Sequence, residues 1–276
     1  METKKYKRVY FPLTDPQQRE IILGLLSAKG WNFEELETGL IAYKPVEEWD
    51  EKELENLTMD FDFPLGWEIS EVSEQNWNSL WEKQISPLYI NDELYIRTSF
   101  HPPAKKDMLE IVIDPKMSFG TGHHPTTELM IRFLLEEQIK GKNLIDMGTG
   151  TGVLSIIACK KGAARVYAID NDPWSYENAR ENVIKNQCEN VQIILNDASA
   201  LKTLPPVDIF MANINRNIIL NDLERYVNNL KKGSILILSG FYADDEDIVL
   251  EKARLLGLKH LSSRESDTWL GMKFVR

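Results

Sequence analysis

The hydrophobic positions in the second half of the chain alternate between the patterns of buried strands and of amphipathic helices. Short runs of mostly apolar residues are typical of strands buried on both faces, and they cover 143–147, 164–170, 191–195 and 207–213. Between them lie helical patterns, one from about Val153 and one over 173–186 that places Tyr176, Ala179 and Ile184 on one side. This alternation predicts an α/β fold with a parallel, doubly wound sheet.

The first part of the chain shows a shorter, mixed pattern. It predicts strands at 8–13, 39–43 and 67–72, a helix that begins at Asp15 and a further helix over 46–57. We expect a small α/β sandwich domain over 1–74 with a role in recognition or scaffolding, because it contains no cluster of catalytic residue types. A linker helix over 75–88, with Trp77 and Trp81 on one face, would lead into a second domain over 89–276.

One glycine-rich run follows the first of the buried strands. It reads Asp146-Met147-Gly148-Thr149-Gly150-Thr151-Gly152 and leads into the helix at Val153. Glycines allow the main chain to come close to a ligand, so the run predicts a nucleoside-binding loop; the alternative is a tight strand–helix turn without a ligand. A dinucleotide fingerprint would need its third glycine at Val153, which disfavours a nicotinamide-dependent oxidoreductase.

Polar side chains also follow the next three strands. Asp170 ends one strand eighteen residues after the last of these glycines, where a carboxylate can accept hydrogen bonds from both hydroxyls of a ribose. Asp172, just before Pro173, is predicted to be the N-cap of the next helix. Asp197 and Asn213 follow the last two strands. Ligands of open α/β sheets bind at this edge, so these groups predict one shared site.

A second glycine-rich loop, Phe119-Gly120-Thr121-Gly122-His123-His124, precedes the first buried strand. It lacks the G-K-[ST] ending of a triphosphate-binding loop. Its two histidines have no third ligand at suitable spacing, so no metal site is expected. We expect a lid over a small ligand, with residues 125–127 starting a helix through Phe133; the alternative is a plain helix entry.

Composition narrows the class of protein. The chain has 276 residues and a formal net charge of −11, which disfavours a nucleic-acid binder and suits a basic protein partner. Cys159 and Cys188 follow no metal-binding or disulfide pattern and fit a reducing compartment. Without a signal segment or an apolar stretch of membrane-spanning length, a cytoplasmic protein with no membrane contact is expected.

In combination, these motifs resemble one family. F-G-T-G-x-H-P-T-T, D-x-G-x-G-x-G, the strand ending in Asp170 and the Ala-Asn-Ile run at 212–214 are similar to the bacterial ribosomal protein L11 methyltransferases, which are class I S-adenosylmethionine-dependent enzymes. The likeness covers nearly the whole chain and is weaker in its first half. It implies a Rossmann-like seven-stranded methyltransferase domain, a small domain that grips the basic target, and S-adenosylmethionine as the cofactor.

The resemblance also implies functions for individual residues. Contacts to S-adenosylmethionine are implied for Thr127, Gly148, Gly150, Asp170 and Asn213, and secondarily for Phe119 and Asp197. Asn213 is also a candidate for positioning the acceptor amine, through a hydrogen bond to its amide oxygen. The chain departs from the family pattern at His123, Thr149, Thr151 and Asn215.

The reaction implied is methyl transfer to α-amino or lysine ε-amino groups of ribosomal protein L11, by an enzyme expected to be a monomer. Transfer needs an aligned, neutral amine, and about a tenth of α-amino groups but less than about a thousandth of lysines are neutral at pH 7. The alternatives are a different protein, a small amine, or a nucleoside-binding regulator without catalysis. A planar acceptor is disfavoured, because the run after Asn213 lacks the Pro-Pro-aromatic sequence that holds such targets.

Overall fold

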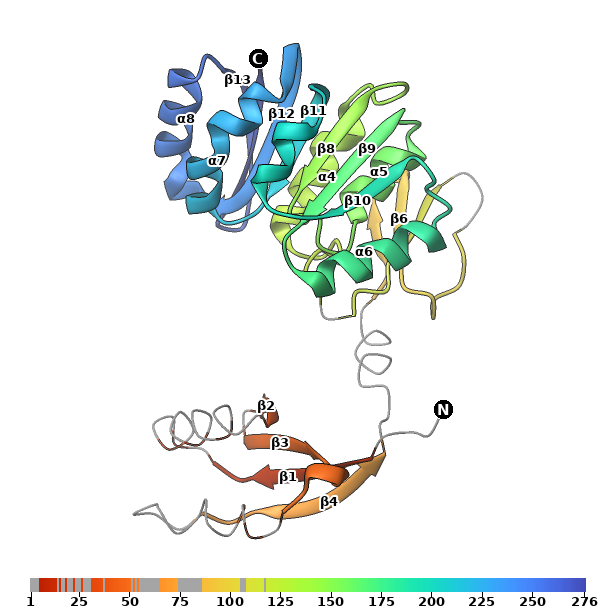
Figure 1. The fold of residues 1–276 in the computed structure, drawn as a ribbon, viewed down its shortest axis with the longest axis vertical. Helices are drawn as coiled ribbons and strands as arrows, with labels where there is room; N and C mark the ends of the chain where they lie inside the picture. Colours follow the sequence, from red (N-terminus) through yellow and green to blue (C-terminus); the bar gives the residue numbers. More distant parts are fainter. Residues whose placement is uncertain are drawn as a thin grey trace. The chain divides into compact units, whose positions relative to one another are not determined.

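The computed structural model describes residues 5–13, 15, 18, 22, 26, 31–36, 38–50, 52, 54, 65–73, 86–104, 108–116 and 118–276, which are coloured in Figure 1. The chain divides into two compact units, residues 1–80 and 81–276. The boundary falls within the expected linker segment. Residues 74–85, including Trp77 and Trp81, lie outside the described residues.

The amino-terminal unit contains a four-stranded antiparallel sheet in the order β2-β3-β1-β4. Its strands are β1 (Lys5–Phe11), β2 (Asn32–Leu36), β3 (Gly39–Pro45) and β4 (Glu68–Ser73). Side chains alternate across a strand, so every second residue of β1 and β3 can enter one core. Val9 and Leu40 do so, and they are buried together with Ile22, Leu26 and Leu54.

Three of these strands were predicted, and two details of the prediction were wrong. β2 was missed because it contains only two apolar residues, Phe33 and Leu36; it is an edge strand, and Phe33 is exposed. The segment from Val46 forms a 3-10 turn, η1 (Val46–Glu48), because Trp49 is extended and packs edge-on against Trp31. Of the helix expected from Asp15, the described residues Gln18, Ile22 and Leu26 are helical, and so are Lys52 and Leu54 of the second expected helix; the other residues of both segments lie largely outside the described residues.

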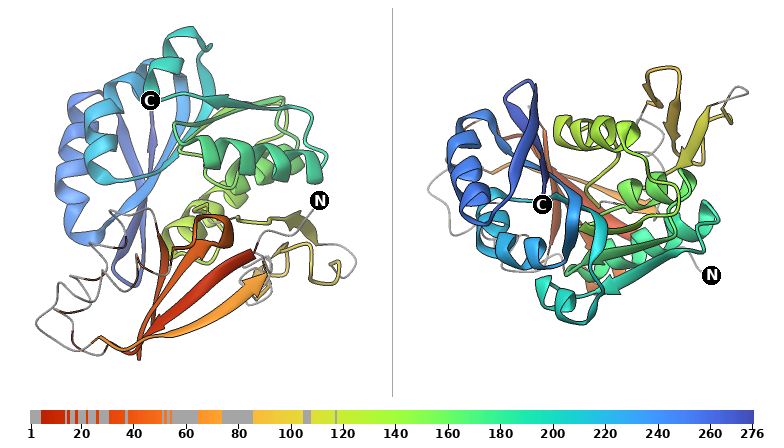
Figure 2. Two further views of the ribbon diagram at one scale, coloured as in Figure 1. Left: turned by 60° about the horizontal axis from the view of Figure 1, so that its bottom comes forward. Right: turned by 90° about the horizontal axis from the view of Figure 1, so that it is seen from above.

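The second unit contains a seven-stranded sheet in the order β10-β9-β8-β11-β12-β14-β13 (Figure 2). Its parallel strands are β8 (Asn143–Met147), β9 (Arg165–Asp170), β10 (Val191–Leu195), β11 (Val207–Asn213) and β12 (Leu230–Tyr242). Strand β14 (Trp269–Val275) is antiparallel to both of its neighbours, β12 and β13 (Lys259–Ser266). The chain reverses its direction of winding between β8 and β11, and ligands of open α/β sheets bind at such a switch point.

Helices cover both faces of this sheet. On one face, α4 (Pro125–Glu136), α5 (Val153–Lys160) and α6 (Pro173–Lys185) pack on alternate strand residues such as Leu144 and Met211. On the other face, η2 (Ala198–Thr203), α7 (Arg216–Asn228) and α8 (Glu246–Leu255) pack on Ile145 and Phe210, while η3 (Ala243–Asp245) links β12 to α8. The predicted doubly wound, Rossmann-like seven-stranded domain is therefore confirmed.

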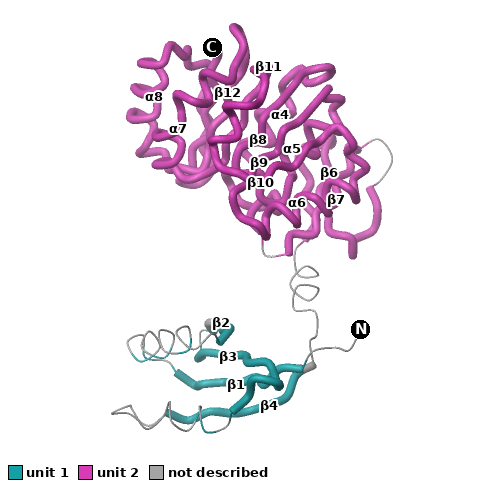
Figure 3. Tube along the Cα trace, in the orientation of Figure 1, with its two compact units in different colours: residues 1–80 teal, residues 81–276 magenta. Residues whose placement is uncertain are grey.

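A small sheet of β5 (Leu88–Ile90), β6 (Leu94–Arg97) and β7 (Leu109–Val112) belongs to the same unit (Figure 3). Ile96 and Ile111 join the core beneath α4 and α5. Among the helices of the described residues, none combines the length and the apolar character needed to cross a bilayer.

Helix α6 differs from its predicted amphipathic pattern. Ala179 is buried as expected, but Ile184 is 65% exposed. The buried face of the helix instead carries polar residues, including Asn178 and Asn182. Hydropathy could not predict this, because this face meets the main chain after β7, whose buried peptide groups need hydrogen-bond partners.

Candidate functional site

Residues 148–152, here called the first glycine loop, connect β8 to α5 at the switch point. The backbone amides of Gly148 and Thr149 donate to the Ile169 carbonyl at 2.8 and 3.0 Å, and the amide of Gly150 donates to Asp170 Oδ2 at 2.9 Å. Gly148 and Gly150 have φ angles of +73° and +55°. A Cβ on Gly148 would lie 2.2 Å from Ile214 Cγ2, and one on Gly150 would lie 2.3 Å from the Phe119 carbonyl oxygen. Glycine is therefore required here by the backbone and by neighbouring protein atoms, whether or not a ligand is bound.

Asp146, at the end of β8, is a buried carboxylate with one satisfied oxygen. Its Oδ2 accepts hydrogen bonds of 2.7 Å from the hydroxyls of Thr149 and Ser155. Its Oδ1 has no partner among the described residues, and the residue is 1% exposed. Burial raises the pKa of Asp146. Sequence reasoning used Asp146 only to define the motif and did not identify its unpartnered oxygen.

The other two acidic residues of this edge are fixed by backbone amides. Asp170 ends β9 and accepts from the amides of Gly150 and Asp172, the latter at 3.1 Å. Each carboxylate oxygen still has a further lone pair for a ligand hydroxyl. Asp197 follows β10, is exposed, and caps η2 by accepting from the Ser199 amide at 2.7 Å. The hydrogen bonds from the Ser199 amide and hydroxyl lower the pKa of Asp197. Asp172 is the N-cap of α6, as predicted.

Asn213 and Thr127 meet from distant parts of the chain. Asn213 ends β11, and its Nδ2 donates to Thr127 Oγ1 at 3.3 Å. Thr127 is held in the first turn of α4, which begins at Pro125 as predicted, and it is 1% exposed. This bond orients the amide so that Asn213 Oδ1 is the free acceptor, and that oxygen is buried without a partner in the described part of the chain. The position therefore favours a ligand with an N–H donor.

Residues 119–122, here called the second glycine loop, are bound to the first. The Thr151 amide donates to the Phe119 carbonyl at 3.0 Å, and the Thr151 hydroxyl donates to the Gly120 carbonyl. The backbone of this loop is thus hydrogen-bonded to the first glycine loop. The Phe119 side chain is 54% exposed.

The two histidines that follow also have protein partners. His123 Nε2 lies 2.7 Å from the Ser86 carbonyl oxygen, and His124 Nδ1 lies 2.8 Å from the Thr126 hydroxyl. Within the described ranges, no three potential metal ligands come together.

A row of aromatic rings extends along the same edge. Phe119 packs edge-on against His124 with 5.0 Å between ring centroids, and His124 packs likewise against Trp269 at 4.9 Å. Trp269 in turn stacks on Tyr242 at 4.3 Å. Burial lowers the pKa of His124, which favours the neutral ring. Sequence reasoning missed Trp269 and Tyr242, because only the pairing of β12 with β14 brings them together.

All the predicted site residues come from elements that meet at the carboxyl edge of the parallel strands. Direct contacts join Asn213 to Thr127 and Asp170 to Gly150, and Phe119 lies against the first glycine loop. Asp197 is more peripheral, next to β9 through the bond from the Asn196 amide to the Asp170 carbonyl. Two buried acceptors of this edge have no partner among the described residues, Asp146 Oδ1 and Asn213 Oδ1. Together with the remaining lone pairs of the Asp170 carboxylate, they fit a ligand that carries hydroxyls, N–H groups and positive charge.

Comparison with known proteins gives a consistent result. The family model for ribosomal protein L11 methyltransferase matches residues 26–276. Proteins of that name from Phocaeicola vulgatus and Porphyromonas gingivalis are each 40% identical to this chain, over 88% and 98% of both chains, respectively. The crystal structure of the ribosomal protein L11 methylase from Lactobacillus delbrueckii subsp. bulgaricus is 25% identical, with a TM-score of 0.65 over 70% of this chain and 99% of that one.

Proposed function

The chain belongs to the ribosomal protein L11 methyltransferase family, and from this premise we propose that it transfers methyl groups from S-adenosylmethionine to α-amino or lysine ε-amino groups of ribosomal protein L11. The observation that supports an amine acceptor best is the buried, unpartnered Oδ1 of Asn213 at the end of β11. We further propose that the amino-terminal unit binds the protein target and that the second unit carries out the transfer.

The residues at the switch point fit the cofactor. Asp170 accepts hydrogen bonds from the ribose hydroxyls with the lone pairs that Gly150 and Asp172 leave free. Asp146 Oδ1 gives the buried negative partner that the methionine ammonium group needs, directly or through water. When bound, S-adenosylmethionine supplies a methyl group on a positively charged sulfur. The Phe119 side chain covers this edge against solvent, and Asp197 borders it.

Asn213 acts on the acceptor. Its Oδ1 accepts an N–H of the amine and leaves the nitrogen lone pair free to attack in line, while Thr127 holds the amide in that orientation. Positioning of this kind can contribute roughly 7–11 kcal/mol, so the transfer needs little further help once the amine is neutral. We assign no general base, and the amine loses its proton to solvent.

The aromatic row suits the chain that carries the amine. Trp269 and Tyr242 present flat apolar faces near Asn213, because Gly240 of β12 lies against the Ile214 backbone and Tyr242 follows two residues later. Such faces pack along an alkyl chain and attract an ammonium group before it loses its proton.

The test is intact-mass spectrometry of purified, unmethylated ribosomal protein L11 incubated with S-adenosylmethionine and the enzyme. We expect mass increments of whole methyl steps, which Gly148→Arg abolishes. Asn213→Ala should lower turnover about a hundredfold with S-adenosylmethionine saturating. Full turnover by Asn213→Ala would refute its positioning role. An unchanged mass with wild-type enzyme that still binds S-adenosylmethionine would refute the target and favour another protein or a small amine.

A further inference from the structure

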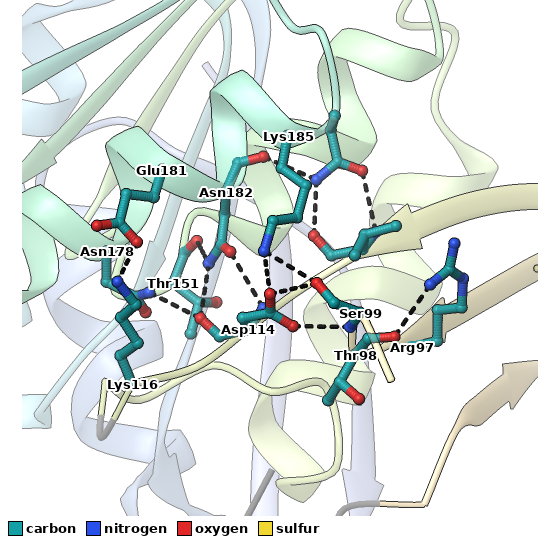
Figure 4. A network of polar contacts seen from close by, with 12 residues as sticks. Arg97, Thr98, Ser99, Asp114, Lys116, Thr151, Asn178, Glu181, Asn182 and Lys185 are labelled. Carbon is teal, nitrogen blue, oxygen red and sulfur yellow. Dashed lines mark hydrogen bonds and ion pairs between the residues drawn. The ribbon is translucent and has the colours of Figure 1, made fainter. Parts of the chain in front are cut away.

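Three buried asparagines are spaced four residues apart along α6 and its C-cap. Asn178, Asn182 and Asn186 are 3%, 1% and 4% exposed, and Figure 4 shows Asn178 and Asn182 in a network of polar contacts with Asp114 and Thr151. Residues at this spacing share one face of a helix. The proposed reaction uses none of them, although a buried amide side chain is costly unless it is fully hydrogen-bonded.

The outer two asparagines hydrogen-bond the main chain of β7 and of the segment that follows it, and Asn186 Nδ2 also donates to the Asn182 carbonyl of its own helix at 2.8 Å. Asn186 Oδ1 accepts from the Val112 amide at 2.9 Å, and its Nδ2 donates to the Val112 carbonyl at 2.7 Å. This pair of bonds replaces a missing neighbouring strand. Asn178 Nδ2 donates to the Asp114 carbonyl at 2.7 Å. Both residues attach the β7 segment to α6.

Asn182 makes the same kind of contact and one more. Its Oδ1 accepts from the Asp114 amide at 3.1 Å, and its Nδ2 donates to the Asp114 carbonyl at 3.3 Å. The same Nδ2 also donates to the Thr151 carbonyl at 3.0 Å. Thr151 is the residue whose amide and hydroxyl bind the second glycine loop. Asn182 therefore holds Thr151, which hydrogen-bonds one glycine loop to the other.

We propose that Asn182 is a positioning residue for the cofactor site: by holding the Thr151 carbonyl, it fixes both glycine loops relative to α6 and to the segment after β7. This inference rests on the proposed binding of S-adenosylmethionine at this edge. A loop presents its ligand-binding groups in a fixed geometry only when the residues that contact the loop are themselves held in place by packing and hydrogen bonds. Here Asn182 Nδ2 is the side-chain donor that holds the Thr151 carbonyl, while the amide and hydroxyl of Thr151 donate to Phe119 and Gly120.

The surrounding contacts make this role separable from folding. Asp114 is also held by Asn178, by an ion pair with Lys185, and by the amide and hydroxyl of Ser99. These bonds remain when Asn182 is shortened, so the β7 segment stays attached to α6.

The experiment compares Asn182→Ala with the matched control Asn186→Ala, which removes an equally buried asparagine from the same helix face without touching the glycine loops. Thermal unfolding, the Kd for S-adenosylmethionine by calorimetry, and turnover on ribosomal protein L11 are measured for both. We expect both variants to lose thermal stability, and only Asn182→Ala to raise the Kd, by at least about tenfold.

A third variant replaces the donor by an acceptor. Asn182→Asp keeps an acceptor for the Asp114 amide, but its carboxylate cannot donate to the Thr151 and Asp114 carbonyls and repels them, so its Kd should rise as well. This variant provides a second measurement if Asn182→Ala does not fold. Equal Kd values for Asn182→Ala and Asn186→Ala, or a wild-type Kd for Asn182→Asp, would overturn the inference. Wild-type enzyme that fails to bind S-adenosylmethionine would instead overturn the proposed function.

Discussion

The two glycine loops look alike in sequence but are stabilised in different ways. The amides of the first loop bond to the end of β9, through the Ile169 carbonyl and Asp170 Oδ2. The carbonyls of the second loop bond to Thr151 of the first. The first loop is therefore part of the sheet edge, whereas the second loop takes its position from the first. A substitution that distorts the first loop should therefore displace both loops, whereas one that distorts the second loop should leave the first in place.

The carboxylates that precede the two loops, Asp146 and Asp114, also differ in how fully they are hydrogen-bonded and in the direction of their pKa shifts. Burial raises the pKa of Asp146, before the first loop, and its two hydroxyl donors do not offset this. Burial also raises the pKa of Asp114, before the second loop, but hydrogen bonds from Lys185 and Ser99 outweigh it, so the net shift is downward. Asp114 is a satisfied structural anion, and Asp146 has one oxygen left for a ligand.

The largest effect is expected from Gly148→Val, which breaks the first loop. The new side chain would collide with Ile214 in a left-handed backbone conformation, which costs about 3 kcal/mol or more and displaces the cofactor loop. The Kd for S-adenosylmethionine should rise more than about a hundredfold. Gly141→Val is the control, because Gly141 has a φ of +77° with no neighbour within 4 Å of a Cβ. Equal binding by both variants would contradict the prediction.

A smaller loss of affinity for S-adenosylmethionine is expected from Asp170→Ala. It leaves the Gly150 amide without its acceptor and removes the proposed ribose contact, so the Kd should rise about ten- to a hundredfold. Calorimetric titration with S-adenosylmethionine measures this. The control Asp172→Ala removes the N-cap of α6 and should lower the thermal stability with an unchanged Kd. If Asp172→Ala weakens binding as strongly, Asp170 has no specific role.

Thr151→Val separates the second loop from the first. The substitution keeps the shape and loses the hydroxyl bond to the Gly120 carbonyl, at a cost of about 1 kcal/mol in the free energy of unfolding. Chemical denaturation measures that loss. Thr151→Ser keeps the donor and loses only a buried methyl group. A Thr151→Val enzyme as stable as the wild type would show that the bond does not hold the second loop.

The smallest effect is expected on the pH dependence of the free energy of unfolding, through Asp114, which precedes the second loop. The pKa of Asp114 is lower in the folded chain than its usual 3.8, so Asp114 contributes stability above pH 3.8 that is lost as pH falls toward the folded value. Asp114→Asn should therefore flatten the acid side of the stability curve, measured by denaturant unfolding at several pH values. An unchanged acid slope would contradict this.

Local features were predicted well because they depend on a few neighbouring residues. The strands over 191–195 and 207–213 have their predicted bounds, and Pro125 and Pro173 begin α4 and α6 as expected. Apolar periodicity and capping act within one turn or one strand, so the sequence alone carries them. The same reasoning failed for Ile184, because a helix face that meets free peptide groups buries asparagine instead of isoleucine.

By itself, the sequence determined the alternation of strands and helices, the glycine turn after β8, and the polar residues at or just after the ends of β8, β9, β10 and β11. Only the tertiary structure decided which of these groups lack partners among the described residues, as Asp146 Oδ1 and Asn213 Oδ1 do, and which distant rings line the same edge, as Trp269 does against His124. The physical reason is that periodicity and capping are local interactions, whereas a free acceptor is what remains after every neighbour in the folded chain has made its hydrogen bonds.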